Sequence, residues 1–441
     1  MPHLDLPGGV RMHYERFDAI HTPEDAASAT APLQTLVVLV PFTSSPLSTL
    51  PQLAATSPLR KNYDIIALAP RSHGETTAPI TAESDHFVAA AELAFAYEAL
   101  QIPPCPLFAP STICSRIALA FTILFPDLVT ALALASLSTR SARRSIAQLV
   151  GFCELAVGGE DSELVIEMFA ELASILGGDG QTDEQKDRLV KFLLRQGGPR
   201  KTRLSYERMG LWYYEAKFPS HVLAAVRQPC LLLYGENDED TLPENDNWEL
   251  LLNGAQTVRI ELIPDTSKMC WIAAPQPVSD ALASFFDEHA HRSESQSAPP
   301  QFEQALTRLA TISHEPGVRD RDLRDPQSFA ALTKQEVQER ADALRRVEAA
   351  EELWCAQHEG PDPWEVPSPR SSVEGDDEQN PRWSPRDEEN KALPSPTSLV
   401  SPPLVSETVT VEVAVLPAGA DTGAATATTR KQSVVSVENE D

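Results

Sequence analysis

Short apolar runs alternate with longer amphipathic stretches over the first two thirds of the chain. The runs are rich in Val, Ile and Leu and lie between turn-forming residues, as is typical of strands buried on both faces. Stretches such as 89–100 and 278–288 place apolar residues at helical spacing instead. Strand and helix in alternation predict an α/β protein with a mostly parallel, twisted sheet covered by helices on both faces. The predicted strands are 10–14, 36–40, 63–68, 107–109, 131–135, 230–234 and 258–263.

One region breaks this alternation. Between 139 and 227 the chain holds several amphipathic helical patterns and no convincing strand. An all-helical insertion between two sheet strands is predicted, arranged as a cap, or lid. We therefore expect the α/β core at 1–138 and 228–292 and the cap at 139–227. The helical patterns within the cap are 145–155, 162–176, 182–195 and 206–214.

The character of the sequence changes after about residue 292. Residues 293–358 carry helical patterns with mixed charges, at 300–312 and 333–356, and predict a charged, partly helical linker. Residues 359–441 are rich in Pro, Ser, Glu and Asp and too poor in apolar residues to form a core, which predicts a disordered acidic tail. Its serine-proline pairs suit proline-directed kinases, so a kinase or another protein partner is expected to act through the tail. These pairs begin at Ser368, Ser384, Ser395 and Ser401.

Overall composition narrows the classes of partner. With 441 residues, of which 42% are apolar, the chain can bury a sizeable core. The formal charge of −28 argues against nucleic acid or an anionic membrane surface as the main partner, because both repel such a field. The six cysteines form neither a C-x-x-C pair nor a cluster with histidine, so neither a metal nor another cofactor is expected. Without a signal-peptide pattern or an apolar run of membrane-spanning length, a cytoplasmic protein is expected.

Several segments carry a family resemblance. Residues 63–76, Y-D-I-I-A-L-A-P-R-S-H-G-E-T, join an apolar strand to an R-x-H-G-x-T turn. They resemble the end of the third strand in the α/β-hydrolase superfamily. The segments L-P-G-G-V-R-M-H-Y at 6–14 and L-V-V-L-V-P-F at 36–42 are similar to two further strands of its lipase, esterase and epoxide-hydrolase-like branch, which has a helical cap. The resemblance covers 1–290 and implies an α/β-hydrolase fold and metal-free acyl transfer.

The resemblance also implies where a nucleophile would stand. The nucleophile elbow follows the strand at 107–109, within A-P-S-T-I-C-S-R-I-A at 109–118. The family's spacing from the nucleophile to a downstream alanine and proline places it at Thr112, with Ser111 as the alternative one residue away. Pro110 and Cys114 stand where the family has glycines, and a β-branched threonine suits the positive φ of an elbow poorly.

The other catalytic positions follow in the same way. The segment P-C-L-L-L-Y-G-E-N-D ends at Asp238, the position of the acid that orients the catalytic histidine. Lys268 holds the position of the histidine itself. Because a lysine ammonium titrates near pH ~10 and imidazole near ~6.5, lysine cannot relay a proton in the usual way, and an ion pair between Lys268 and Asp238 is expected. The backbone N–H groups of Phe42 and Ile113 take the oxyanion positions, and Pro41 replaces the glycine of the family's His-Gly.

Three functions remain open. The altered base, glycine and His-Gly positions favour a non-catalytic α/β-hydrolase-fold protein that binds a small apolar ligand or a protein partner under the cap. The alternative is an active hydrolase of esters or lactones, in which Thr112 or Ser111 attacks, Asp238 orients and Lys268 serves as an unusual base. A third reading is an interaction protein that acts through its phosphorylatable acidic tail.

Overall fold

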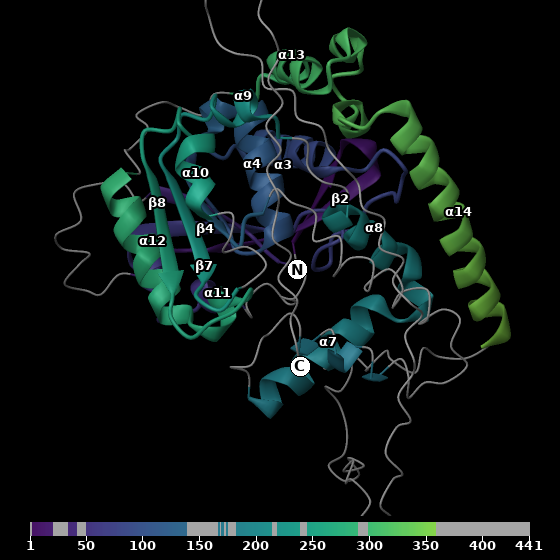
Figure 1. The fold of residues 1–441 in the computed structure, drawn as a ribbon, viewed down its shortest axis with the longest axis horizontal. Coiled ribbons are helices and arrows are strands. Elements are labelled where there is room, and N and C mark those ends of the chain that lie inside the picture. The colour runs from purple at the N-terminus through teal and green to yellow at the C-terminus, as the bar shows by residue number, and fades with distance from the viewer. Residues whose placement is uncertain are drawn as a thin grey trace, which may run out of the picture. The chain divides into compact units, whose positions relative to one another are not determined.

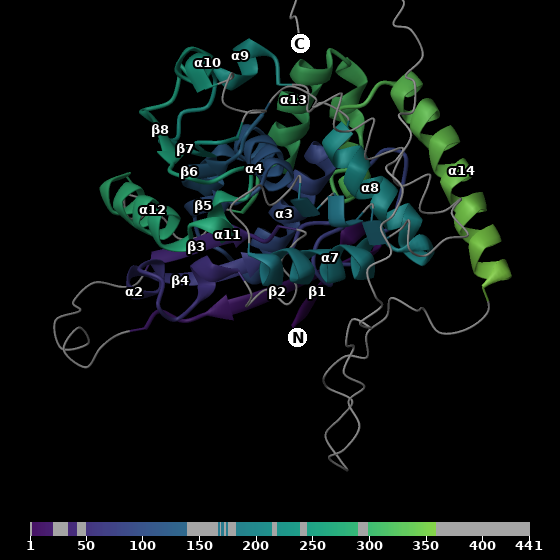
Figure 2. The same ribbon diagram turned by 60° about the horizontal axis from the view of Figure 1, so that its bottom comes forward.

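The computed structural model describes residues 2–20, 34–41, 50–138, 166–167, 169–171, 173–174, 182–213, 218–238, 245–289 and 299–358. Within these residues, eight strands form one sheet (Figure 1). Their order is β1-β2-β4-β3-β5-β6-β7-β8, which can be followed in Figure 2. The pairs β1–β2 and β2–β4 are antiparallel, and every pair from β4 to β8 is parallel. This confirms the predicted mostly parallel sheet. The strands are β1 His3–Leu6, β2 Val10–Phe17, β3 Gln34–Leu39, β4 Tyr63–Leu68, β5 Cys105–Ala109, β6 Val129–Ala135, β7 Cys230–Gly235 and β8 Val258–Ile263.

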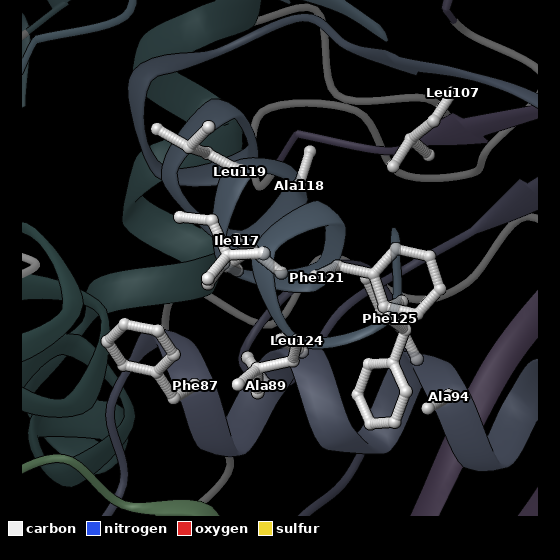
Figure 3. Packing of buried hydrophobic residues seen from close by; sticks show 14 of the residues in the cluster. Phe87, Ala89, Ala94, Leu107, Ile117, Ala118, Leu119, Phe121, Leu124 and Phe125 are labelled. Atoms are coloured by element: carbon white, nitrogen blue, oxygen red, sulfur yellow. The ribbon is translucent and has the colours of Figure 1, made fainter. Parts of the chain in front are cut away.

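Helices cover both faces of this sheet because successive strand residues point to opposite sides. Val37 and Leu39 of β3 belong to one buried cluster, together with side chains of α3 (His86–Leu100) and α4 (Thr112–Leu124). Leu36 and Val38 belong to the other, together with side chains of α2 (Leu59–Asn62), α11 (Cys270–Ala273) and α12 (Pro275–His289). Figure 3 shows part of the first cluster, with Phe121 of α4 and Phe125, directly after its end, on the side of α4 that faces α3. The core is therefore split into two layers by the sheet.

Local signals set the ends of α3. The Asp85 carboxylate accepts hydrogen bonds of 2.9 Å from the N–H groups of Phe87 and Val88, which have no partner within the helix. At the other end Gln101 adopts φ 53°, a left-handed conformation that terminates the helix. Alanines dominate the buried side of α3 and let α4 approach closely. This close pair holds the turn between β5 and α4 in place.

The described part of the cap is helical, as predicted. It consists of α7 (Asp183–Gly197), the short 3-10 helix η5 (Pro199–Lys201), α8 (Thr202–Tyr213) and α9 (Ser220–Leu223). Helix α8 begins at Thr202, earlier than the predicted 206, because η5 runs directly into it. The predicted helix 145–155 and parts of 162–176 lie outside the described residues.

Residues 299–358 pack on the domain, which revises their expected place in a linker. Helix α13 (Phe302–Ser313) buries Phe302, Leu306 and Leu309 in the same cluster as α3 and α4. The ring of Phe302 stacks on Phe95 of α3 with centroids 4.5 Å apart. Two short 3-10 helices, η7 (Pro316–Asp320) and η8 (Pro326–Phe329), then lead to α14 (Lys334–Gln357). The mixed charges suggested a solvated segment, but one apolar side of α13 closes the core of the domain.

All of the described residues belong to one compact unit. The predicted disordered tail at 359–441 lies outside the described residues. Among the helices that the structure does describe, none combines the length and apolar character needed to cross a membrane.

Candidate functional site

The predicted site residues lie at the carboxyl ends of the parallel strands. Ser111 and Thr112 follow β5, Asp238 follows β7, and Lys268 follows β8. Because parallel strands all end at the same edge of a sheet, residues far apart in the sequence meet there. The turn after β7 is hydrogen-bonded to the turn after β8, since Asn237 N donates to the Thr266 carbonyl at 2.8 Å. Asp238 and Lys268 are thus carried by two turns that contact each other.

The turn between β5 and α4 is a helix cap. Ser111 has φ −139° and ψ 160°, and its Oγ accepts from Cys114 N at 3.4 Å. Thr112 is the first residue of α4, and its Oγ1 donates to the Ser136 carbonyl at 2.9 Å. Among the described residues with positive φ, none lies within 109–113. A nucleophile elbow needs such a residue at its apex, so neither hydroxyl is presented in that conformation here.

Ser136, which the sequence analysis missed, connects the strand ends. It follows β6, is almost fully buried and has φ 50°, a conformation that a non-glycine residue rarely adopts. Its Oγ donates to the Lys268 carbonyl at 2.8 Å, while its own carbonyl accepts from Thr112. The structure thus brings Thr112 and Lys268 together through Ser136. The only signal in the sequence was a serine directly after an apolar strand.

Asp238, at the acid position, is buried, with 1% of its surface exposed. Its N–H donates to the Gly235 carbonyl at 3.1 Å. A Cβ on Gly235 would lie 2.2 Å from the Ser267 carbonyl oxygen, so only glycine lets the β7 and β8 turns approach this closely. Burial raises the pKa of the Cys270 thiol to about 12, and the Asp238 carboxylate adds to the rise. The charge of Asp238 is therefore felt in the segment that contains both Cys270 and Lys268. The side chain of Lys268 is half-buried.

Of the two predicted oxyanion residues, Ile113 is among the described residues and Phe42 is not. Ile113 is buried near the start of α4, so its N–H belongs to the first turn of that helix. Phe42 lies outside the described residues, while Pro41 is included. The nearby thiol of Cys114 contacts the Val40 carbonyl at 3.7 Å. The ends of β3 and β5 are therefore adjacent, as the fold requires.

Two buried histidines lie near this edge in the neutral form. Burial lowers the pKa of His73 to about 4, and its Nδ1–H donates to the Arg71 carbonyl at 2.7 Å. Burial also lowers the pKa of His86 well below its ordinary value, and Arg116 and Arg340 lower it further. His73 lies between β4 and α3, and His86 is the first residue of α3. Lys268 remains the residue at the base position.

A buried ionic cluster between sheet and cap was also missed. Arg71, which follows β4, binds the carboxylates of Glu92 in α3 and Glu207 in α8, with closest distances of 2.9 Å and 3.0 Å. Burial alone would lower the pKa of Arg71, but these two carboxylates outweigh it and raise the pKa. Arg208 joins the cluster by donating to the Ser72 carbonyl at 2.5 Å. We name Arg71, Glu92, Glu207 and Arg208 the inner clamp, because they join cap helix α8 to the core.

Two described cavities lie away from the triad positions. One, of about 430 Å³, lies between α8 and α14, and the other, of about 580 Å³, lies beside η8 and the start of α14. Neither is lined by Ser111, Thr112, Asp238 or Lys268. Over the described part of the chain, no group of three or more His, Cys, Asp and Glu side chains has a geometry that would hold a metal ion.

Comparisons of the sequence and of the structure give different results. Neither a protein-family model nor a curated protein matches the sequence. Solved structures do match the fold. An enol-lactonase from Burkholderia xenovorans is 14% identical with a TM-score of 0.51, covering 65% of this chain and 100% of its own. An α/β-hydrolase enzyme from a Medee basin deep-sea metagenome library is 14% identical with a TM-score of 0.51, covering 67% and 100%. A hydrolase from Pseudomonas aeruginosa is 16% identical with a TM-score of 0.50, covering 65% and 97%.

These matches show that the neighbours and this chain share an overall fold. At such low sequence identity the similarity concerns the fold and not the chemistry. Together with the sheet order and the placement of the turns after β4, β5, β7 and β8, it shows that this chain has the α/β-hydrolase fold.

Proposed function

We propose that this protein is a non-catalytic α/β-hydrolase-fold protein that binds a small apolar ligand or a protein partner under its cap. The observation that carries the proposal is the geometry of the β5–α4 turn. Ser111 caps α4 and Thr112 donates to the Ser136 carbonyl, so both hydroxyls already form hydrogen bonds with backbone groups. Lys268 at the base position supports the same conclusion, because a charged ammonium accepts no proton.

Apolar side chains of the cap support an apolar ligand. Leu189 and Leu193 of α7 are buried in the same cluster as Met269, next to Lys268. Phe169 and Val190 are only partly buried and pack against this cluster. An acyl chain or a similar small apolar molecule has the chemistry that such side chains bind.

The alternative is hydrolysis of esters or lactones, the class of reaction in the name of the enol-lactonase neighbour. Here Thr112 or Ser111 would attack, Asp238 would orient and Lys268 would act as the base. A partner or kinase that acts through the tail at 359–441 is a third, independent proposal, which rests on its serine-proline pairs.

The test compares turnover with binding in the full-length protein. A panel of p-nitrophenyl esters from short to long acyl chains, and a simple lactone, is offered to the wild type and to Thr112→Ala, Ser111→Ala and Lys268→Ala. Thr307→Ala on the exposed side of α13 serves as the control. We expect no turnover that depends on these residues, together with a rise in melting temperature on adding a long-chain fatty acid. Turnover lost in Thr112→Ala or Ser111→Ala, and in Lys268→Ala, would establish the hydrolase instead.

A further inference from the structure

Cap helix α8 is held on two sides. The inner clamp holds it to the core, with Glu207 bonded to Arg71, whose side chain has no exposed surface. On the other side lies α14, which contacts α8 and η5 and runs alongside α8 in Figure 2. Helix α8 is thus placed between the α/β core and the C-terminal extension.

Helix α8 contacts α14 through hydrogen bonds between charged side chains. Arg203 in the first turn of α8 donates from Nε to Glu351 Oε1 at 2.8 Å and from Nη1 to Glu348 Oε1 at 2.9 Å. Its backbone N–H donates to Glu351 Oε2 at 2.8 Å. The Glu351 carboxylate therefore sits at the N-terminus of α8, where the helix dipole favours a negative charge. We name Arg203, Glu348 and Glu351 the outer clamp.

The end of α14 makes a second contact with the cap. The Arg200 guanidinium lies 5.7 Å from the centre of the Trp354 ring, and Arg200 Nη2 donates to the His358 carbonyl at 2.8 Å. Trp354 is buried and its ring stacks on that of His358. Between these contacts lies the cavity of about 430 Å³, lined by Arg203 and Glu348 among others. The interface is thus formed by specific polar contacts around a gap instead of a continuous apolar seam.

The beginning of α14 is fixed to the core instead. Ala331 N donates to Asp85 Oδ2 at 2.8 Å, and the other oxygen of Asp85 caps α3. Arg340 in α14 is buried, with 2% of its surface exposed, and its charge acts on the Asp85 carboxyl. Helix α14 therefore starts on the core and ends on the cap, and bridges the two.

We propose that α14 is a strap that holds cap helix α8 down on the core, and that the outer clamp is the part that releases first. The two clamps differ in solvent exposure. The Arg71 side chain is fully buried, whereas the Arg203 side chain is 42% exposed. Salt screens exposed ion pairs far more than buried ones, so ionic strength weakens the outer clamp and leaves the inner clamp intact. This device controls access beneath the cap whether or not the site performs chemistry.

Hydrogen exchange of the full-length protein tests the strap. Glu351→Gln removes the charge from the outer clamp, and Glu352→Gln removes the same charge from the neighbouring, exposed position. In Glu351→Gln we expect the amides of 202–213 to exchange about tenfold faster, because a charge-assisted contact is lost. In Glu352→Gln they should exchange as in the wild type. In both variants the amides of α3 and α4 should keep their protection.

A salt titration is the second test of the strap. Raising the salt concentration from about 0.05 M to about 1 M should speed exchange of 202–213 in the wild type and have little further effect in Glu351→Gln. Equal exchange of 202–213 in Glu351→Gln and Glu352→Gln would overturn the proposal. So would a rise that spreads evenly over α3, α4 and α8, because α8 would then not open on its own.

Discussion

Glu207 of cap helix α8 accepts a hydrogen bond of 3.0 Å from Nη1 of Arg71, a residue 136 positions earlier in the chain. The guanidinium also binds Glu92, so one buried cation joins the strand turn, α3 and the cap. Burial raises the pKa of Glu92, although Arg71 acts in the opposite direction. The cap is therefore attached to the core by charge as well as by apolar packing.

Replacing this cation should be costly. Arg71→Met removes the cation that the buried carboxylates of Glu92 and Glu207 both bind, and we expect the free energy of unfolding to fall by about 3–5 kcal/mol. Chemical denaturation measures the loss. The triple variant Arg71→Met, Glu92→Gln, Glu207→Gln removes the stranded charges and should recover much of the stability. If the triple variant were less stable than Arg71→Met alone, uncompensated charge would not be the cause.

Gly235 should not tolerate a side chain. In Gly235→Ala the new Cβ would lie 2.2 Å from the Ser267 carbonyl oxygen and 2.4 Å from that of Thr266, both rigid backbone atoms. We expect a loss of about 3 kcal/mol in stability, because the turns after β7 and β8 must separate. Gly317→Ala is the matched control, since no atom lies within 4 Å of its added Cβ. Similar melting temperatures for the two variants would contradict the close approach of the turns.

His73 should make stability depend on pH. Its folded pKa of about 4 lies below the ordinary value of 6.5, so the unfolded chain binds a proton first as the pH falls. Stability contributed by neutral His73 is complete above pH ~6.5 and is lost between about 6.5 and 4, amounting to about 3 kcal/mol. In His73→Asn the amide still donates to the Arg71 carbonyl but cannot titrate, so this part of the pH dependence should disappear.

The exposed His314 supplies the control for that experiment. It has φ 57°, which asparagine tolerates, so His314→Asn should leave the fold and the pH dependence as in the wild type. Urea denaturation at several pH values between about 4 and 8 gives the curves to compare. Parallel curves for the wild type and His73→Asn would show that His73 titrates at its ordinary pKa.

Ser111, before α4, and Ser115, in the first turn of α4, should differ in their effect on stability. The single hydroxyl hydrogen of Ser115 is shared between the carbonyls of Ala135 at 2.8 Å and Ala109 at 3.1 Å, which joins α4 to β6 and β5. Ser115→Ala leaves these buried carbonyls one donor short, and we expect a loss of about 2 kcal/mol. Ser111→Ala removes only a long capping bond of 3.4 Å, at a cost of about 0.5 kcal/mol. The reverse order of melting temperatures would argue against these hydrogen bonds.

Much of the fold can be predicted from local patterns in the sequence. Buried parallel strands such as β4 and β7 appear as short apolar runs, because both faces are covered by helices. The resemblance to the α/β-hydrolase superfamily, and not the hydrophobic pattern, pointed to Thr112, Asp238 and Lys268 as site positions. β1 was missed because its four residues, HLDL, carry too few apolar positions to stand out.

Only the tertiary structure determined which contacts those residues make. The bond from Thr112 to Ser136, and from Ser136 to Lys268, spans 24 and then 132 positions in the chain, beyond the reach of any local pattern. The same holds for Arg71 and Glu207, and for Glu351 at the N-terminus of α8. Periodicity along a chain records which face of an element is buried. Which polar groups meet there depends on how elements distant in sequence pack, and only the folded chain determines that.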